Sequence, residues 1–347
     1  MLSLPTIPLI DLNAQAAARA RQAALTKPAG SLGQLEDLSI QLAGITGRLR
    51  PSLTRKAVII MAGDHGVALE GVSAYPSEVT PQMVLNFVHG GAAINVLARQ
   101  ANARVIAVDI GVAVTLASLP GLLIRNVAHG TQNMAQGPAM TRRQTEDAIA
   151  IGLNVIEAEI DQGLDMVATG DMGIGNTTPS SAIVAAITGY PVSQVTGRGT
   201  GIDDARLARK IATIERALSI NRPDSHDPLD VLSKVGGLEI AGLAGVIIGG
   251  AAHRIPVVID GFISGAAALI AAELVPEVKP YLIAAHRSVE IGHRAILDRL
   301  GLRPLIDLDL RLGEGTGAVL AFHFVEAAVR ILNEMATFAE AGVSEKE

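Results

Sequence analysis

The chain alternates between short, uninterrupted apolar runs and longer segments with helical periodicity, and this alternation restricts it to few folds. The apolar runs are 57–61, 105–110, 165–169, 256–260, 281–284 and 305–309. Helical patterns cover roughly 80–101, 142–162, 179–187, 203–217, 236–251, 261–274 and 287–300. Strands that are apolar throughout are buried on both faces, and strands that alternate with helices run parallel. We therefore predict an α/β fold: a parallel β-sheet with helices on both faces, in a Rossmann-like three-layer arrangement.

The composition excludes several classes of function. Of the 347 residues 49% are apolar, which is enough for one sizeable core. The absence of cysteine excludes disulfides, thiolate chemistry and cysteine–metal sites. Aromatic residues make up only 2% and the net charge is −6, whereas nucleic-acid-binding modules use aromatic side chains and a basic face. We therefore expect no nucleic-acid partner.

No segment has the pattern of a signal peptide or a membrane span. Residues 1–5 lack a charged region followed by a continuous apolar one. Residues 172–197 carry no charge, but they contain asparagine, glutamine, serines, threonines and prolines, which do not suit a lipid environment. We expect a soluble, cytoplasmic protein with no membrane partner.

One carboxylate, Glu314, lies between glycines in the stretch 310–320. A β-like run precedes this stretch and an apolar helical pattern follows it, and open α/β sheets bind ligands at such strand ends. A carboxylate walled by apolar residues is held partly dry, which suits a general base. The alternative is a glycine-rich turn whose glutamate is solvated or near a helix N-terminus.

The stretch 170–179 (GDMGIGNTTP) is the second strong motif. A strand ends at its glycines, and Pro179 suits the first turn of a helix capped by Thr178. Free backbone N–H groups at such a turn bind phosphate. The stretch matches neither the Walker loop nor G-x-G-x-x-G, and a tight strand-to-helix turn is the alternative.

Three weaker motifs each have two interpretations. The tetrapeptide 63–66 (GDHG) is catalytic or a capped turn. Glycines in 196–204 beside a basic helix bind an anion, or the helix presents a solvated basic face. His286, Glu290 and His293 have i, i+4, i+7 spacing, which favours a hydrogen-bonded helix face over a metal site. The residues alone thus indicate an α/β enzyme with a phosphate-bearing small substrate and a carboxylate base.

The same stretches resemble one enzyme family, the nicotinate-nucleotide–dimethylbenzimidazole phosphoribosyltransferases. The similar blocks are 27–33 (KPAGSLG), 63–67 (GDHGV), 78–80 (EVT), 170–179 (GDMGIGNTTP), 234–237 (KVGG), 260–262 (DGF), 286–290 (HRSVE) and 311–317 (RLGEGTG). They span nearly the whole chain in family order.

The resemblance implies a pentosyl transfer in cobalamin biosynthesis. Nicotinate mononucleotide gives its phosphoribosyl group to 5,6-dimethylbenzimidazole with inversion at C1′, which yields α-ribazole 5′-phosphate and nicotinate. Glu314 matches the family's general base, which takes a proton from the benzimidazole. No metal and no cofactor are implied. The alternative is a paralogue that binds nucleotide or benzimidazole without catalysis, and the retained Glu314 argues against it. The preferred base stays open.

The resemblance also assigns the other site residues. Asp171 stands where the family usually has glutamate, so it is a candidate second carboxylate whose reach is shorter by about one methylene. The residues that match the benzimidazole pocket are Tyr75, Met83, Met172, Ile174 and Leu312. Some relatives carry Ser and Gln in place of Tyr75 and Met83, which makes this pocket more apolar. The nucleotide and phosphate side is matched by Gly173, Gly199, Lys210, Gly261 and Ser288.

The domain organisation and the quaternary structure are further implications. Residues 1–50 with 320–347 are expected to form a small helical domain, and 51–319 a large α/β domain that binds the substrates. The family is typically a homodimer, in which the partner contributes to the edge of the site.

Overall fold

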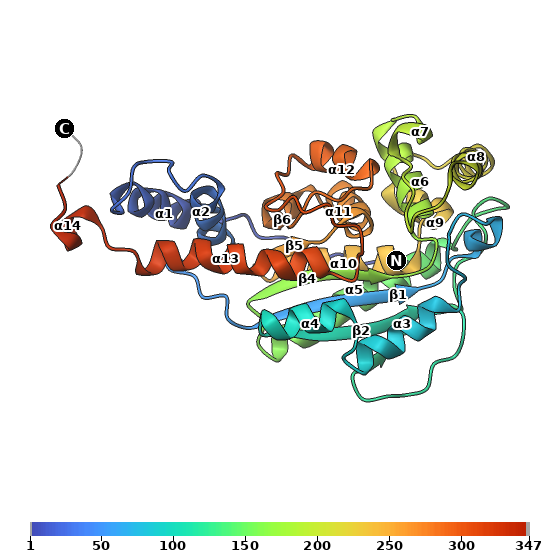
Figure 1. Ribbon diagram of the computed structural model, residues 1–347, viewed down its shortest axis with the longest axis horizontal. Helices are drawn as coiled ribbons and strands as arrows, with labels where there is room; N and C mark the ends of the chain where they lie inside the picture. Colours follow the sequence, from blue (N-terminus) through green and yellow to red (C-terminus); the bar gives the residue numbers. More distant parts are fainter. Residues whose placement is uncertain (1, 345–347) are drawn as a thin grey trace.

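The computed structural model describes residues 2–344 and is built on one six-stranded sheet, in which all strands are parallel (Figure 1). The spatial order is β3-β2-β1-β4-β5-β6. The strands are β1 (Lys56–Gly63), β2 (Ala103–Gly111), β3 (Leu122–Ile124), β4 (Met166–Met172), β5 (Val257–Ile259) and β6 (Leu282–Ala284). The chain builds outwards from β1 in one direction and from β4 in the other. The carboxyl ends of β1 and β4 therefore form the topological switch point, where α/β sheets bind ligands.

Helices cover both faces of the sheet, as predicted. Alternate residues of one strand enter two different cores: Ile59 and Met61 of β1 pack into one, and Val58 and Ile60 into the other. The helices α5 and α10 lie on the first side, and α3, α4 and α13 on the second (Figure 1). Since every residue of β1 is buried, the strand reads as an uninterrupted apolar run.

The helices have the following bounds: α1 (Leu12–Ala24), α2 (Gln34–Thr46), α3 (Val79–Val88), α4 (Ala93–Gln100), α5 (Arg142–Asp161), α6 (Thr177–Thr188), α7 (Val192–Val195), α8 (Asp204–Asn221), α9 (Pro228–Val235), α10 (Leu238–Ala252), α11 (Phe262–Leu274), α12 (Gly292–Leu300), α13 (Thr316–Glu334) and α14 (Phe338–Ala341). Two 3₁₀ helices complete the set, η1 (Gly66–Glu70) and η2 (Pro276–Tyr281).

Several sequence-based boundaries are wrong. The helix expected over 80–101 is two helices, because the chain turns at Gly90, whose φ is +77°, before α4 begins. The expected strand 305–309 is a single bridge between Ile306 and His286. The short strand β3 and the helix α9 were not expected.

The two ends of the chain pack together. Ala18 of α1, Ile40 and Ala43 of α2, and Leu332 of α13 form a small apolar cluster. Arg21 Nε donates to the Leu332 carbonyl oxygen at 2.6 Å. Figure 1 shows α1 and α2 beside the far end of α13, away from α3. The division into a small helical and a large α/β domain stays a prediction.

The helix α13 is apolar because it runs through the core. It is long and apolar enough to cross a membrane, but 56% of its most apolar window is buried within the protein. Its residues Ala318, Val319 and Phe322 pack in the core on the second side of the sheet, the side that α3 and α4 also cover. A helix that starts at the ligand-binding edge and continues into a core needs this composition.

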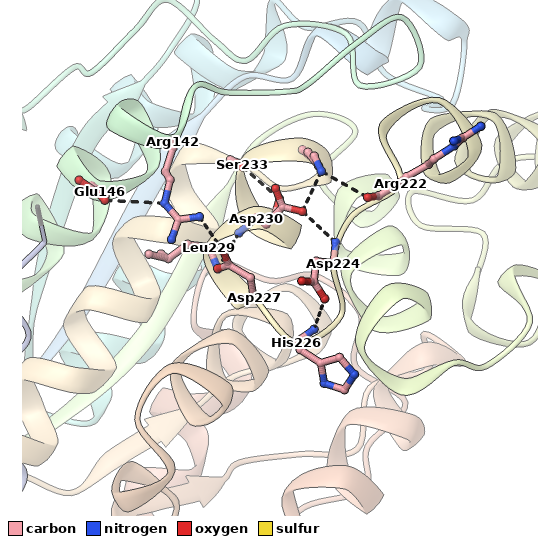
Figure 2. A network of polar contacts seen from close by, with 10 residues as sticks. Arg142, Glu146, Arg222, Asp224, His226, Asp227, Leu229, Asp230 and Ser233 are labelled. Carbon is pink, nitrogen blue, oxygen red and sulfur yellow. Dashed lines mark hydrogen bonds and ion pairs between the residues drawn. The ribbon is translucent and has the colours of Figure 1, made fainter.

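A polar network holds α9 against α5 (Figure 2). Asp227 caps α9 by accepting from the backbone N–H groups of Leu229 and Asp230 at 3.0 and 3.1 Å. Arg142 of α5 donates to the same carboxylate at 2.7 Å, and Lys234 donates to Asp230 at 2.8 Å. The network fixes the chain just before it turns at 236–237 into α10.

Candidate active site

A cavity with mainly apolar walls, of about 350 Å³, lies at the carboxyl ends of β4, β5 and β6. Its walls come from the segments that follow these strands, from residues 75–83, from residues 199–200 and from the loop that leads into α13. All the predicted site residues except Lys210 line it: Tyr75, Met83, Asp171, Met172, Gly173, Ile174, Gly199, Gly261, Ser288, Leu312 and Glu314. The structure thus brings together residues that are spread along most of the chain, from Tyr75 to Glu314.

The loop that carries Glu314 has an unusual backbone. Gly313, Glu314 and Gly315 have φ values of +83°, +62° and +89°. A left-handed conformation is rare for a residue with a side chain and persists only where the surroundings enforce it. Here the backbone of Gly170 approaches so closely that a Cβ on Gly170 would lie 2.5 Å from the Glu314 carbonyl oxygen. The glycines of two motifs therefore serve one purpose, the placement of Glu314.

Asp260 clamps the same loop from the end of β5. Its carboxylate accepts from the backbone N–H of Ala318 at 2.9 Å and from that of Gly315 at 3.3 Å. Burial raises the pKa of Asp260 to about 7, against the effect of these backbone donors. Asp260 is not among the predicted site residues, although a carboxylate directly after a buried strand is the signal that would have indicated a role.

Glu314 itself is buried at the first turn of α4. Its Oε2 accepts from the backbone N–H of Ile94 at 3.3 Å, and only 5% of the residue is exposed. Burial raises the pKa of Glu314 above its usual value, and the Ile94 N–H opposes part of this shift. A carboxylate with a raised pKa that lines a cavity has the properties of a general base.

Asp171 lies beside Glu314 and has a second hydrogen-bond partner of its own. It is buried, and its Oδ2 accepts from Asn176 Nδ2 at 2.9 Å. Burial, followed by the neighbouring carboxylates of Asp260 and Glu239, raises the pKa of Asp171 well above its usual range.

Lys210 lies behind the cavity wall rather than on it. Its Nζ donates to Thr177 Oγ1 at 2.7 Å and to the Gly197 carbonyl oxygen at 3.2 Å. A Cβ on Gly199, which does line the cavity, would be 3.5 Å from Nζ. Burial lowers the pKa of Lys210 to about 8, and the nearby carboxylate of Glu290 opposes the shift. The ammonium group of Lys210 thus lies directly behind the glycine-rich wall of the cavity and forms hydrogen bonds with it.

The helix-face interpretation of the histidine motif is wrong, because α12 begins only at Gly292. His286 lies in a bridge, Glu290 lies in a turn, and only His293 is on the helix. His293 Nδ1 accepts from the Ser288 N–H at 3.0 Å, and Glu290 Oε1 accepts from the Gly199 N–H at 2.7 Å. Burial lowers the pKa of His286 to about 4 and that of His293 to about 3. Residues 2–344 contain no cluster of three or more side chains able to hold a metal.

The remaining walls combine apolar and polar side chains. Tyr75 and Leu312 are exposed, while Ile174 is buried. The sequence-based predictions did not include six polar side chains on the wall: Asn176, Thr177, Thr200, His286, Glu290 and Arg311. All except Thr200 fall inside blocks on which the family resemblance rests, which was the available signal.

Comparisons with known proteins point to one enzyme family. The model of a family described as phosphoribosyltransferase matches residues 7–343. The nicotinate-nucleotide–dimethylbenzimidazole phosphoribosyltransferase of Chloroflexus aggregans is 67% identical over 97% of this chain and 96% of its own. The protein of the same name from Roseiflexus sp. strain RS-1 is 66% identical, with the same coverage. The crystal structure of the enzyme of that name from Thermus thermophilus has a TM-score of 0.93 and 49% identity, and covers 97% of this chain and all of its own.

Proposed function

The chain belongs to the nicotinate-nucleotide–dimethylbenzimidazole phosphoribosyltransferase family, and we propose that Glu314 is the general base of its reaction. The enzyme transfers the phosphoribosyl group of nicotinate mononucleotide to 5,6-dimethylbenzimidazole in cobalamin synthesis. The observation that carries the proposal is a single one: a buried carboxylate with a raised pKa, held by a strained loop, lines the apolar cavity at the strand ends.

The chemistry requires such a group. One ring nitrogen of the benzimidazole attacks C1′ of the ribose from the face opposite nicotinate, and the C1′–nicotinate bond breaks with inversion. The other ring nitrogen must lose its proton as the bond forms, and Glu314 accepts it. Nicotinate leaves as a neutral pyridine ring from a pyridinium, so the remaining catalysis consists of positioning and charge stabilisation.

The direct test is nicotinate release from nicotinate mononucleotide in the presence of dimethylbenzimidazole, with the second product identified as α-ribazole 5′-phosphate. The binding-only alternative predicts that both molecules bind and no nicotinate appears. A carboxylate in the cavity argues for turnover, since a binding protein has no need of a buried base.

Asp171 lines the cavity, and we propose that it serves as a hydrogen-bonding group. We expect Asp171→Asn to keep kcat/KM within about tenfold of wild type, because the amide keeps the shape of the side chain and an oxygen that accepts from Asn176. Steady-state assays of nicotinate release measure this. A loss of about 10²-fold or more would instead make Asp171 a participant in proton transfer.

Lys210 supplies positive charge to the phosphate of the donor through the 197–199 wall. Because its pKa is lowered to about 8, the ammonium is present below that pH and is lost above it. We expect the KM for nicotinate mononucleotide to rise as the pH passes about 8 in the wild type. Lys210→Arg should abolish this rise, since arginine stays charged. Lys210→Met should raise KM by about tenfold or more below pH 8 and remove the rise through that pH. A flat KM in the wild type would remove the role.

The proposal includes a homodimer in the cytoplasm. The loops 286–291 and 306–312 lie side by side at the mouth of the cavity, joined by the hydrogen bond from the Val289 N–H to the Leu310 carbonyl oxygen at 3.2 Å. Among the apolar side chains that these loops expose are Val289, Ile291, Leu308 and Leu312. A patch of this kind supports a partner subunit at the edge of the site. Sedimentation equilibrium tests the dimer, and a monomer at assay concentrations would contradict it.

A further inference from the structure

A buried histidine–glutamate pair lies behind the part of the cavity wall that Gly173 forms. His65 Nε2 and Glu239 Oε1 are 2.8 Å apart, and both side chains are fully buried. His65 follows β1, whereas Glu239 is in the first turn of α10. Neither residue lines the cavity, and the reaction derived above uses neither.

Three glycine motifs converge on this pair. A Cβ on Gly237 would lie 2.5 Å from both Glu239 Oε2 and His65 Cε1, and one on Gly63 would lie 3.4 Å from Glu239 Oε2. A Cβ on Gly173, which lines the cavity, would collide with the Gly63 carbonyl oxygen and lie 3.2 Å from His65 Nε2. Each of the blocks 63–67, 170–179 and 234–237 therefore has a glycine at the position where a side chain would collide with the pair or with its surroundings. These glycines let the pair pack directly against the cavity wall.

The pair also faces the acidic side of the site. Four carboxyl groups gather at the strand ends: Asp171, Glu239, Asp260 and Glu314. Burial, the largest effect on His65, lowers its pKa, but Glu239 and then Asp64 outweigh burial, so the net pKa of His65 is raised. The carboxylate that raises the pKa of Asp171, Glu239, is thus the one that lies 2.8 Å from the His65 ring.

We propose that His65 and Glu239 are positioning residues of the transferase. As an imidazolium–carboxylate pair, they hold the strand end at Gly173 and balance the negative charge that Asp171 and Glu314 experience. Neither residue touches substrate. The role in holding the strand end at Gly173 rests only on the transferase activity, and the role in balancing charge also rests on Glu314 as the base.

The electrostatic part is tested by the pH dependence of kcat/KM. His65→Gln leaves Glu239 without its cation. The midpoint of the acidic limb of the kcat/KM profile should therefore move to a pH that is higher by about one unit. The double variant His65→Gln/Glu239→Gln replaces the ion pair by a neutral pair of similar shape. Its limb should return to within about 0.3 units of wild type, even if kcat stays reduced.

The control is His253→Gln, which removes an exposed histidine at the other end of α10 and should leave the profile unchanged. A purely structural role would lower kcat in the single variant without moving the limb. The proposal is overturned if the limb of His65→Gln stays within about 0.2 units of wild type, or if the double variant shifts as far as the single one.

Neutron diffraction on the wild-type protein gives a result that requires no variant to fold. We expect deuterium on both ring nitrogens of His65 at a pH where the enzyme is active. A neutral imidazole there would overturn the ion pair. This outcome is independent of Glu314, because failure of the base assignment would appear in the Glu314 variants and leave the protonation of His65 unchanged.

Discussion

Glu314→Gln lowers kcat by about 10²-fold or more while both substrates still bind, if Glu314 takes the proton from the benzimidazole. The amide keeps the side-chain volume and still accepts from the Ile94 N–H, so the loop conformation is retained. It cannot accept the proton of the ring nitrogen. Steady-state nicotinate release gives kcat, and equilibrium dialysis gives the two binding constants.

The matched control is Glu290→Gln, a second buried carboxylate on the wall of the same cavity. Its oxygen accepts from the Gly199 N–H on the donor side, so we expect its main effect on the KM of the donor. Equal losses of kcat in the two variants would contradict a specific role for Glu314.

The raised pKa of Glu314 predicts the shape of the wild-type pH profile. The base acts only when deprotonated, so kcat/KM should fall as the pH drops through the pKa of Glu314, above the usual range of a glutamate. This acidic limb should disappear in Glu314→Gln.

Gly170→Ala should reduce kcat by about 10²-fold, although Gly170 does not line the cavity, because a displacement of about 1 Å at a catalytic group has that effect. The added methyl would lie 2.5 Å from the Glu314 carbonyl oxygen and 3.0 Å from the Gly315 nitrogen. Both are backbone atoms of the strained loop, so the loop and its carboxylate must move. Kinetics and thermal unfolding of the variant are measured together.

Gly137→Ala is the matched control, because nothing lies within 4 Å of a Cβ at Gly137. It should retain wild-type kcat. A Gly170→Ala enzyme with activity within about threefold of wild type would show that the loop tolerates displacement, and the positional argument would fail.

The sheet was predictable because its strands are buried on both faces and therefore appear as apolar runs. Residues 57–61 and 105–110 fall within β1 and β2, and their parallel pairing follows from the helices between them. The expected strand 305–309 failed for a physical reason: only Ile306 pairs, and the chain then turns into the Glu314 loop. A short apolar run does not reveal whether a neighbouring strand is long enough to pair with it.

The site was partly predictable for a different reason. Glycines at strand ends mark places where the backbone must approach something closely, and Gly170, Gly313 and Gly315 all proved to surround Glu314. Pairwise contacts between distant segments were not accessible. The clamp from Asp260 to Ala318 and the pair of His65 with Glu239 join residues 58 and 174 positions apart.

The most direct test of Glu314 as the base is chemical rescue of Glu314→Ala with formate, followed by nicotinate release. The alanine variant opens a space beside the benzimidazole that a small carboxylate can enter. We expect a loss of about 10²-fold or more without formate, and a saturable recovery of kcat as formate is added, with no effect of formate on the wild type. An alanine variant that keeps more than about a tenth of the wild-type kcat, or one that binds both substrates and gains nothing from formate, would contradict the assignment of Glu314 as the base.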